Sequence, residues 1–372
     1  MINRERLIKR FMDYVKIDSE TGNEKKFSEK IVKELKDLGL EVRTDKAGKK
    51  IGSNGNNVYC YIKGKGNKSR FYSAHMDTVK PGIGIKPILE DGYIKSSGDT
   101  ILGGDDKAGI SVVMEAVNSI VENNIEHNSI EIIFTISEEG GLNGAKNLDP
   151  SLIKSKEGYI FDSGGHVGII INQAPSQKKL YIEVLGEPAH AGGEPEKGVS
   201  AINVASEAIS KMKLLRIDEE TTANIGTFKS EGATNIVNPK AYIEAEARSL
   251  SEEKLKKQTD HMVEMFEETA KRYGAEVKID IEHLYSAYKL SNDEAVIEYV
   301  EKIMKDLDIN IEKISSGGGS DANILNEKGL KAVNLGFGGN HAHTLKENLN
   351  IEDFTKLAEL TYRLMTDWNN IY

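Results

Sequence analysis

The sequence predicts an α/β protein in which a mixed-sheet, three-layer catalytic domain is interrupted by an inserted ferredoxin-like α+β lid domain. In the first and last parts of the chain, runs of consecutive apolar residues alternate with amphipathic helical stretches, as in a sheet covered on both faces. In the middle, strand patterns of alternating polarity follow the order β-α-β-β-α-β of a ferredoxin-like domain. The length of 372 residues also suits two domains better than one.

The outer parts of the chain carry the elements of the catalytic domain. Apolar residues that recur at every third or fourth position predict helices at Arg4–Val15, Lys25–Leu38, Lys107–Asn123, Asn292–Leu307, Ala322–Glu327 and Ile351–Asn369. Short β-rich runs between them predict core strands at Arg70–Ala74, Ile130–Ile136, Gly158–Phe161 and Ala332–Gly336. Because strands and helices alternate, we expect parallel or mixed pairing.

The middle of the chain, residues 177–286, is predicted to form the lid. Strand patterns there cover Lys178–Gly186, Ala223–Ser230, Ala241–Arg248 and Glu276–Ile281, and helical patterns cover Ser200–Met212 and Glu252–Tyr273. The α/β pattern resumes near Tyr288. We therefore expect a catalytic domain made of residues 1–176 and 287–372, with the lid inserted between the two segments.

The overall composition excludes some classes of function. The net charge of −10, from 49 basic and 59 acidic residues, argues against a nucleic-acid partner, which requires a basic face. No segment approaches the ~18–20 apolar residues of a membrane span, and charged residues interrupt the N-terminal stretch Met1–Ile17 as they would not in a signal peptide. The one cysteine, Cys60, permits no internal disulfide. We therefore expect a cytoplasmic protein.

Acidic and histidine residues follow the ends of the predicted core strands. Open α/β sheets place ligand sites beyond the carboxyl ends of their strands, so residues at these ends should converge in space. A further segment, Gly103–Gly109, places Asp105 among glycines before a helix, where the backbone can approach a ligand closely. The strand-end residues are His75 and Asp77, Glu138 and Glu139, Asp162, and His341 and His343.

Histidine and carboxylate donors without a thiolate favour Zn²⁺, with Co²⁺ or Mn²⁺ as substitutes. A set of five ligands that includes one bridging carboxylate fits two metal ions ~3.5–4 Å apart. In the Glu138–Glu139 pair, one carboxylate is expected to bind metal and the other to take a proton from the attacking water. Asp77 shares a face with His75, so it can accept the second N–H of that ring. Each residue alone is more often structural, and the prediction depends on their combination.

The motifs around these residues resemble those of the aminoacylase, carboxypeptidase G and tripeptidase (peptidase T) superfamily of dimetal hydrolases, and most closely its peptidase T-like branch. The resemblance covers nearly the whole chain in the same order, including the inserted lid. The matching motifs are Ser73–Val79, Gly103–Gly109, Ser137–Gly141, Asp162–Gly165, Pro188–Gly192 and His343–Glu347.

The resemblance implies roles for the strand-end residues. His75 and Asp162 would hold one metal, Glu139 and His343 the other, and Asp105 would bridge them. His341 is the alternative to His343, but the pattern His-x-x-x-Glu selects His343, with Glu347 four residues later.

By the same resemblance, Glu138 would be the general base and Asp77 would orient His75. The peptide bond after the bridging Asp105 would be cis.

The lid contributes three further residues by this resemblance. His190 resembles the residue that donates to the tetrahedral oxyanion, often from the lid of a neighbouring subunit, which implies a homodimer through the lid. Asn235 and Arg248 resemble anchors for a substrate carboxylate. For Arg248 the alternative is a surface ion pair.

Three functions are compatible with these features. The first is an aminopeptidase or tripeptidase-like enzyme acting on short peptides, which Asp162 favours because the deacylase branches tend to have Glu there. Gly317, however, stands where peptidase T has an arginine. The second is a deacylase acting on N-acyl amino acids, and the third is a non-catalytic metal-binding relative, which usually lacks the base or a ligand. Comparing a free-amine tripeptide with its N-acetylated form separates the first two.

Overall fold

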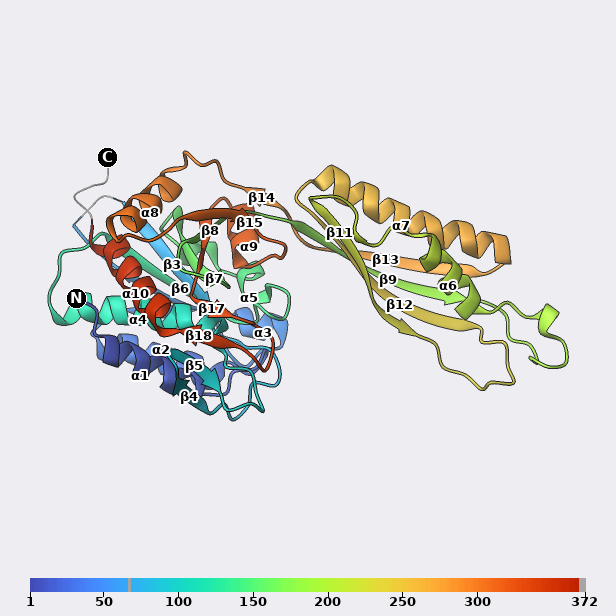
Figure 1. Cartoon of the computed structure of the whole chain (residues 1–372), viewed down its shortest axis with the longest axis horizontal. Helices are drawn as coiled ribbons and strands as arrows, with labels where there is room; N and C mark the ends of the chain where they lie inside the picture. Colours follow the sequence, from blue (N-terminus) through green and yellow to red (C-terminus); the bar gives the residue numbers. More distant parts are fainter. Residues whose placement is uncertain (66–67, 368–372) are drawn as a thin grey trace. The chain divides into compact units, whose positions relative to one another are not determined.

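A computed structural model of the chain describes residues 1–65 and 68–367, which form two compact units. The catalytic unit comprises Met1–Asn172, Leu290–Ser315 and the chain from Ser320 onward. The lid unit comprises Gln173–Lys289, a few residues more at each end than the predicted insertion, together with the short loop Ser316–Gly319. Figure 1 traces the elements of both units along the chain.

A mixed sheet forms the centre of the catalytic unit. Its strands lie in the order β1-β2-β6-β3-β7-β16-β8, and β6, β3, β7 and β16 are parallel neighbours. The mixed α/β class predicted from the sequence is therefore confirmed. The strands are β1 (Val42–Thr44), β2 (Val58–Ile62), β3 (Ser69–His75), β6 (Ser129–Thr135), β7 (Glu157–Ser163), β8 (Ile169–Ala174) and β16 (Lys331–Gly336), with β15 (Glu312–Ser315) pairing with β8. The short β14 (Tyr288–Lys289) pairs with Gln173 and Ala174, within the lid unit.

The central strands carry runs of adjacent apolar residues because both of their faces are covered. Every residue of β6 is buried, as are the last six residues of β3. Helix α4 packs against β3 and β7, α1 and α10 pack against α4, and α9 packs against β16 (Figure 1). The helices are α1 (Arg4–Val15), α2 (Lys25–Asp37), α3 (Ala47–Ile51), α4 (Gly104–Glu122), α5 (Asn143–Lys146), α8 (Ala295–Asp306), α9 (Asp321–Glu327) and α10 (Ile351–Thr366).

Several boundaries differ by a few residues from the sequence-based expectation; helix α8, for example, begins at Ala295 where the pattern predicted Asn292. Helix α4 begins before Lys107, but Asp105 and Asp106 have non-helical dihedral angles, so the regular helix starts where the pattern predicted. The predicted end of the last helix, Asn369, lies outside the described residues. A small four-stranded sheet was not predicted, because its strands are too short to show a period: β4 (Pro87–Glu90), β5 (Tyr93–Ser96), β17 (Gly339–Asn340) and β18 (Asn348–Asn350).

The lid unit is a five-stranded antiparallel sheet in the order β10-β11-β12-β9-β13, with two helices. Its chain order agrees with the predicted β-α-β-β-α-β pattern, with the two-residue β10 in addition. The elements are β9 (Ser176–Leu185), α6 (Ala201–Lys211), β10 (Leu215–Arg216), β11 (Thr221–Lys229), β12 (Lys240–Ser249), α7 (Glu252–Tyr273) and β13 (Glu276–Tyr285).

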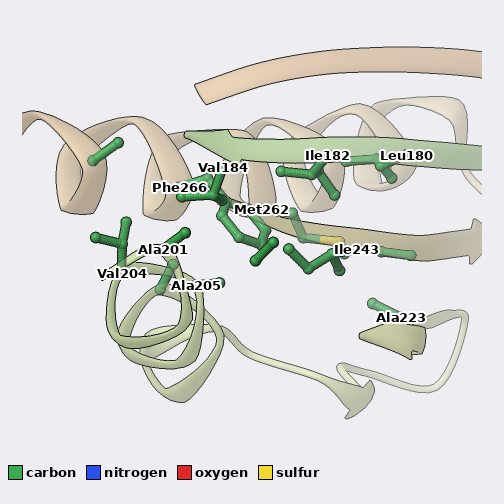
Figure 2. Packing of buried hydrophobic residues seen from close by; sticks show 14 of the residues in the cluster. Leu180, Ile182, Val184, Ala201, Val204, Ala205, Ala223, Ile243, Met262 and Phe266 are labelled. Atoms are coloured by element: carbon green, nitrogen blue, oxygen red, sulfur yellow. The ribbon is translucent and has the colours of Figure 1, made fainter. Parts of the chain in front are cut away.

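One face of the lid sheet carries the core of this unit. Figure 2 shows Leu180, Ile182 and Val184 of β9 packed with residues of the two helices, among them Val204 of α6 and Phe266 of α7. Strands β9 and β12 alternate between buried and half-buried residues, as strands with one open face do. Among the described residues, no helix is long and apolar enough to cross a membrane.

Candidate metal centre

The parallel strands bring the predicted metal ligands to one edge of the catalytic sheet. His75 is the last residue of β3, and it pairs in register with Thr135, the last residue of the neighbouring β6. Glu139 follows β6 by four residues, and Asp162 is the next-to-last residue of β7, on the other side of β3. Strand ends that are distant in the sequence therefore meet at this edge.

A cluster of ligand atoms lies at this edge. One donor atom from each of His75, Asp105 and Glu139 lies within 4.8 Å of the other two, which is close enough for one metal ion. His75 Nε2 is 3.0 Å from Asp105 Oδ1. The other oxygen of that carboxylate, Oδ2, is 3.3 Å from His343 Nε2. Each oxygen of Asp105 thus faces one histidine, the arrangement that a bridging carboxylate requires.

Two further predicted ligands complete the cluster. His343 Nε2 lies 2.6 Å from Glu139 Oε1, so the ring of His343 reaches the acidic residues. Asp162 Oδ1 lies 3.9 Å from His75 Nε2. The Asp162 N–H donates to the Asn334 side chain at 2.9 Å, which fixes this end of β7 against β16. All five predicted ligands therefore lie in one group, arranged as two pairs around Asp105.

The cluster has an excess of negative charge that a cation would neutralise. Burial raises the pKa of Asp162, and the nearby carboxylates of Glu138 and Asp105 raise it further. Hydrogen bonds with Asp105 and Glu139 raise the pKa of His343 to about 10. Burial disfavours the ionised form of Asp105, but the hydrogen bonds with His343 and His75 outweigh it and hold its pKa below the ordinary value. Because three predicted carboxylate ligands face two histidines, this donor set fits divalent metal ions, which would supply the counter-charge.

Glu138 lies beside the cluster with only 8% of its surface exposed. Burial is the main reason why the pKa of Glu138 lies well above its ordinary value, and the carboxylates of Asp321 and Glu139 add to it. A buried carboxyl group whose pKa is raised is suited to exchange protons near neutral pH.

Asp77 contacts both His75 and the Glu138–Glu139 loop. Its contact with His75 is made by the backbone carbonyl oxygen, whereas the carboxylate was expected to make it. His75 Nδ1 lies 3.0 Å from the backbone carbonyl oxygen of Asp77 and 3.5 Å from its carboxylate. The carboxylate instead accepts the backbone N–H groups of Glu138, at 2.9 Å, and Glu139, at 3.1 Å. Asp77 is fully buried, so these contacts fix the loop that carries the proposed base and one ligand.

The Glu347 carboxylate anchors the loop of the bridging aspartate. It accepts the backbone N–H groups of Leu102, Gly103 and Asp105 at 2.7, 2.8 and 3.0 Å. A Cβ atom at Gly104 would lie 3.1 Å from Glu347 Oε1, so a glycine there makes this close approach easier. The Asp105–Asp106 peptide bond is cis, as the resemblance implied. Only the spacing of Glu347 from His343 signalled its importance, and nothing in the sequence pointed to its three backbone partners.

Two other supporting residues were missed by the sequence analysis. Asn334 of β16 joins Asp162 to Ser320, since its side chain also donates to the Ser320 hydroxyl at 3.3 Å. Asp321, the first residue of α9, accepts the Thr135 hydroxyl and is almost fully buried. Ser320, the residue before Asp321, caps this helix, since its hydroxyl accepts the N–H of Ala322.

The three predicted lid residues lie within the lid unit. His190 is exposed, and its Nδ1 accepts the N–H groups of Gly192 and Gly193 at 3.1 and 2.9 Å. An acceptor at Nδ1 places the proton of the neutral ring on Nε2. The backbone carbonyl of Asn235, also exposed, accepts the N–H of Ala191. Arg248 forms an ion pair with Glu246, Nε to Oε1 at 3.0 Å.

The chain is similar over nearly its full length to several known proteins. The uncharacterized protein YqjE of Bacillus subtilis strain 168 is 45% identical over 368 residues, which cover 99% of each chain. The crystal structure of aminopeptidase PepT from Bacillus cereus ATCC 10987 matches with a TM-score of 0.91 and 43% identity, over 99% of this chain and 100% of that chain. The structure of a tripeptidase from Staphylococcus aureus subsp. aureus Mu50 matches with a TM-score of 0.95 and 40% identity, over 99% of both chains.

The family comparison agrees with the geometry of the site. The model of peptidase family M20/M25/M40 matches residues 71–367, a range that contains all five predicted ligands and the inserted lid. The chain therefore belongs to peptidase family M20/M25/M40.

Proposed function

We propose that this protein is a two-metal aminopeptidase that hydrolyses short peptides. The observation that carries the proposal is the Asp105 carboxylate, whose two oxygens face His75 and His343 at 3.0 and 3.3 Å. The names of two relatives that are 40–43% identical, an aminopeptidase and a tripeptidase, support the choice of substrate.

Two divalent metal ions, Zn²⁺ with Co²⁺ or Mn²⁺ as substitutes, fit the donor set of histidines and carboxylates. His75 and Asp162 would hold one ion, Glu139 and His343 the other, and Asp105 would bridge them. Bound metal ions lower the pKa of a water molecule and polarise the scissile carbonyl.

Glu138 is the general base of this proposal. It takes the proton from the attacking water and passes it to the amine of the leaving peptide. The Asp77 carboxylate keeps Glu138 in place by accepting the backbone N–H of Glu138. The backbone carbonyl oxygen of Asp77 holds the ring of His75.

The lid residues have proposed roles toward the substrate. His190 would donate its Nε2 proton to the oxyanion, which the acceptor role of Nδ1 supports. Asn235 and Arg248 would bind a substrate carboxylate, although Glu246 already engages Arg248. We further propose that the lid carries a homodimer interface and that the protein is cytoplasmic, which sedimentation analysis and cell fractionation would test.

The decisive experiment compares two substrates and also determines how much metal the protein binds. The purified protein is assayed with a tripeptide that has a free amine and with its N-acetylated form, while bound metal is determined by mass spectrometry. The proposal expects two divalent ions per chain and cleavage of the free-amine peptide. Cleavage of the acetylated form alone would instead identify a deacylase of N-acyl amino acids, and a protein without metal or turnover would be a non-catalytic relative.

A further inference from the structure

The segment of residues 17–24, between α1 and α2, lies along the loop that follows His75. The N–H of Thr78 donates to the Ser19 carbonyl oxygen at 3.0 Å, and the N–H of Thr21 donates to the Thr78 carbonyl oxygen at 3.1 Å. We call residues 17–24 the N-terminal strap. The strap lies outside residues 71–367, the part of the chain that the family model matches.

The side chain of Thr21 contacts Asp77, the residue that holds the Glu138–Glu139 loop. Its hydroxyl donates to Asp77 Oδ2 at 2.8 Å. The same carboxylate accepts the N–H groups of Glu138 and Glu139, so Thr21 is the third donor to one fully buried group. A carboxylate held by three donors has little freedom to rotate, which keeps both backbone N–H groups in position.

A second residue of the strap holds the same loop from another side. Glu24, with no exposed surface, accepts the N–H of Ser137 at 3.1 Å and that of Gly22 at 2.8 Å. Ser137 has a φ of 55°, a left-handed conformation that a serine rarely adopts without support. The strap thus holds the loop before Glu138 through Glu24 and the loop after it through Thr21 and Asp77.

Lys107 fastens the beginning of the strap to α4. Its ammonium group donates to the carbonyl oxygen of Ile17 at 2.7 Å and lies 4.8 Å from the centre of the Phe27 ring. Lys107 is fully buried and follows the bridging Asp105 by two residues. The strap is therefore tied at one end to the helix behind the bridging ligand and at the other end to the loop of the base.

We infer that Thr21 is a positioning residue for peptide hydrolysis, acting through the Asp77 carboxylate on the Glu138–Glu139 loop. The inference rests on the proposed role of Glu138 as general base. Without the hydroxyl, the Asp77 carboxylate keeps two of its three donors and gains freedom to rotate, and the carboxylate of Glu138 is then held less firmly at its distance from the attacking water. Loss of one such supporting partner typically lowers activity about 10–100-fold.

The test compares Thr21→Val, which keeps the shape but removes the hydroxyl, with Thr21→Ser, which keeps the hydroxyl. Thr361→Val is the matched control, because Thr361 is a buried threonine of the same unit whose hydroxyl donates to the Leu357 carbonyl oxygen of its own helix. We expect a kcat about 10–100-fold lower in Thr21→Val with KM and bound metal nearly unchanged. Thr21→Ser should restore kcat, and Thr361→Val should keep it.

The inference is wrong if kcat of Thr21→Val stays at the level of the unmodified protein, or if Thr21→Ser loses as much. If Thr21→Val does not fold, Thr21→Ala compared with Thr21→Ser gives the same decision, because only Ser keeps the donor. Glu138→Gln separates the two proposals: an active Glu138→Gln refutes the general base, whereas an inactive Glu138→Gln with an unaffected Thr21→Val refutes only the role of Thr21. In the Asp77→Asn background, Thr21→Val should lower kcat little further, since both substitutions act through the side chain at position 77.

Discussion

Replacing Glu347 by glutamine should weaken metal binding, although Glu347 is not a ligand. Its two carboxylate oxygens accept three backbone N–H groups, from Leu102, Gly103 and Asp105. A glutamine has one acceptor oxygen and one NH₂ group, and the NH₂ group cannot accept. If the amide oxygen takes the place of Oε2, the bonds to Leu102 and Gly103 remain and the bond to Asp105 is lost. The opposite orientation loses two bonds.

The size of the effect follows from the hydrogen bond that is lost. A bond between a backbone N–H and a charged acceptor contributes roughly 1.5–3 kcal/mol. The lost bond holds the main chain of the bridging ligand, so the metal ions must restore its position when they bind. A loss of that size corresponds to about 10–100-fold weaker binding, in agreement with the usual effect of removing a residue that supports a ligand.

The assay is a metal titration against a chelator of known affinity, with thermal unfolding of the metal-free protein measured in parallel. Glu131→Gln is the matched control, because Glu131 is also a buried carboxylate, and it accepts the backbone N–H groups of Lys154 and Ser155. The control should lower the unfolding temperature and keep the metal affinity. An unchanged metal affinity in Glu347→Gln, or an equal loss in Glu131→Gln, would refute the reasoning.

Three other predictions test separate parts of the site. Glu138→Gln should keep both metal ions and lose kcat by several orders of magnitude, because it removes the proton acceptor; full activity would contradict the assignment. His190→Ala should lower kcat ~10²–10³-fold if an oxyanion donor is lost, and steady-state kinetics with an unchanged kcat would make His190 structural. Burial raises the pKa of Asp321 from 3.8 to about 6, so native metal-free protein binds this proton more tightly than unfolded protein, and the associated stability is lost as pH rises from ~4 through ~6. As pH rises through that range, the free energy of unfolding of Asp321→Asn should increase relative to that of the unmodified protein by on the order of 2–3 kcal/mol. Denaturant unfolding measures it, and curves of unfolding free energy against pH that run parallel for the two proteins would contradict the prediction.

Periodicity of the sequence was sufficient for the main elements. Strands β3 and β6 carry adjacent apolar residues, such as Phe71 and Tyr72 in β3 and Ile132 and Ile133 in β6, because both faces of the sheet are covered. Helix α7 was predicted to end at Tyr273, and it does so, with Gly274 in the left-handed conformation as its cap. Short elements such as β10 and β17 were missed, since two residues carry no period.

The sequence by itself determined that histidines and carboxylates follow the ends of the core strands. It also determined that they converge, because parallel strands end at one edge whatever their order in the sheet. The choice of His343 over His341 came from the family resemblance, whose pattern His-x-x-x-Glu places Glu347 four residues after His343. Tertiary structure alone decided how these side chains are supported. Thr21, Asp77 and the Glu138–Glu139 loop meet across 56 to 62 positions of sequence, and Glu347 meets the Asp105 loop across more than 240. Such contacts leave no local pattern, because a hydrogen bond between distant segments depends on where the fold brings them and on no property of either segment alone.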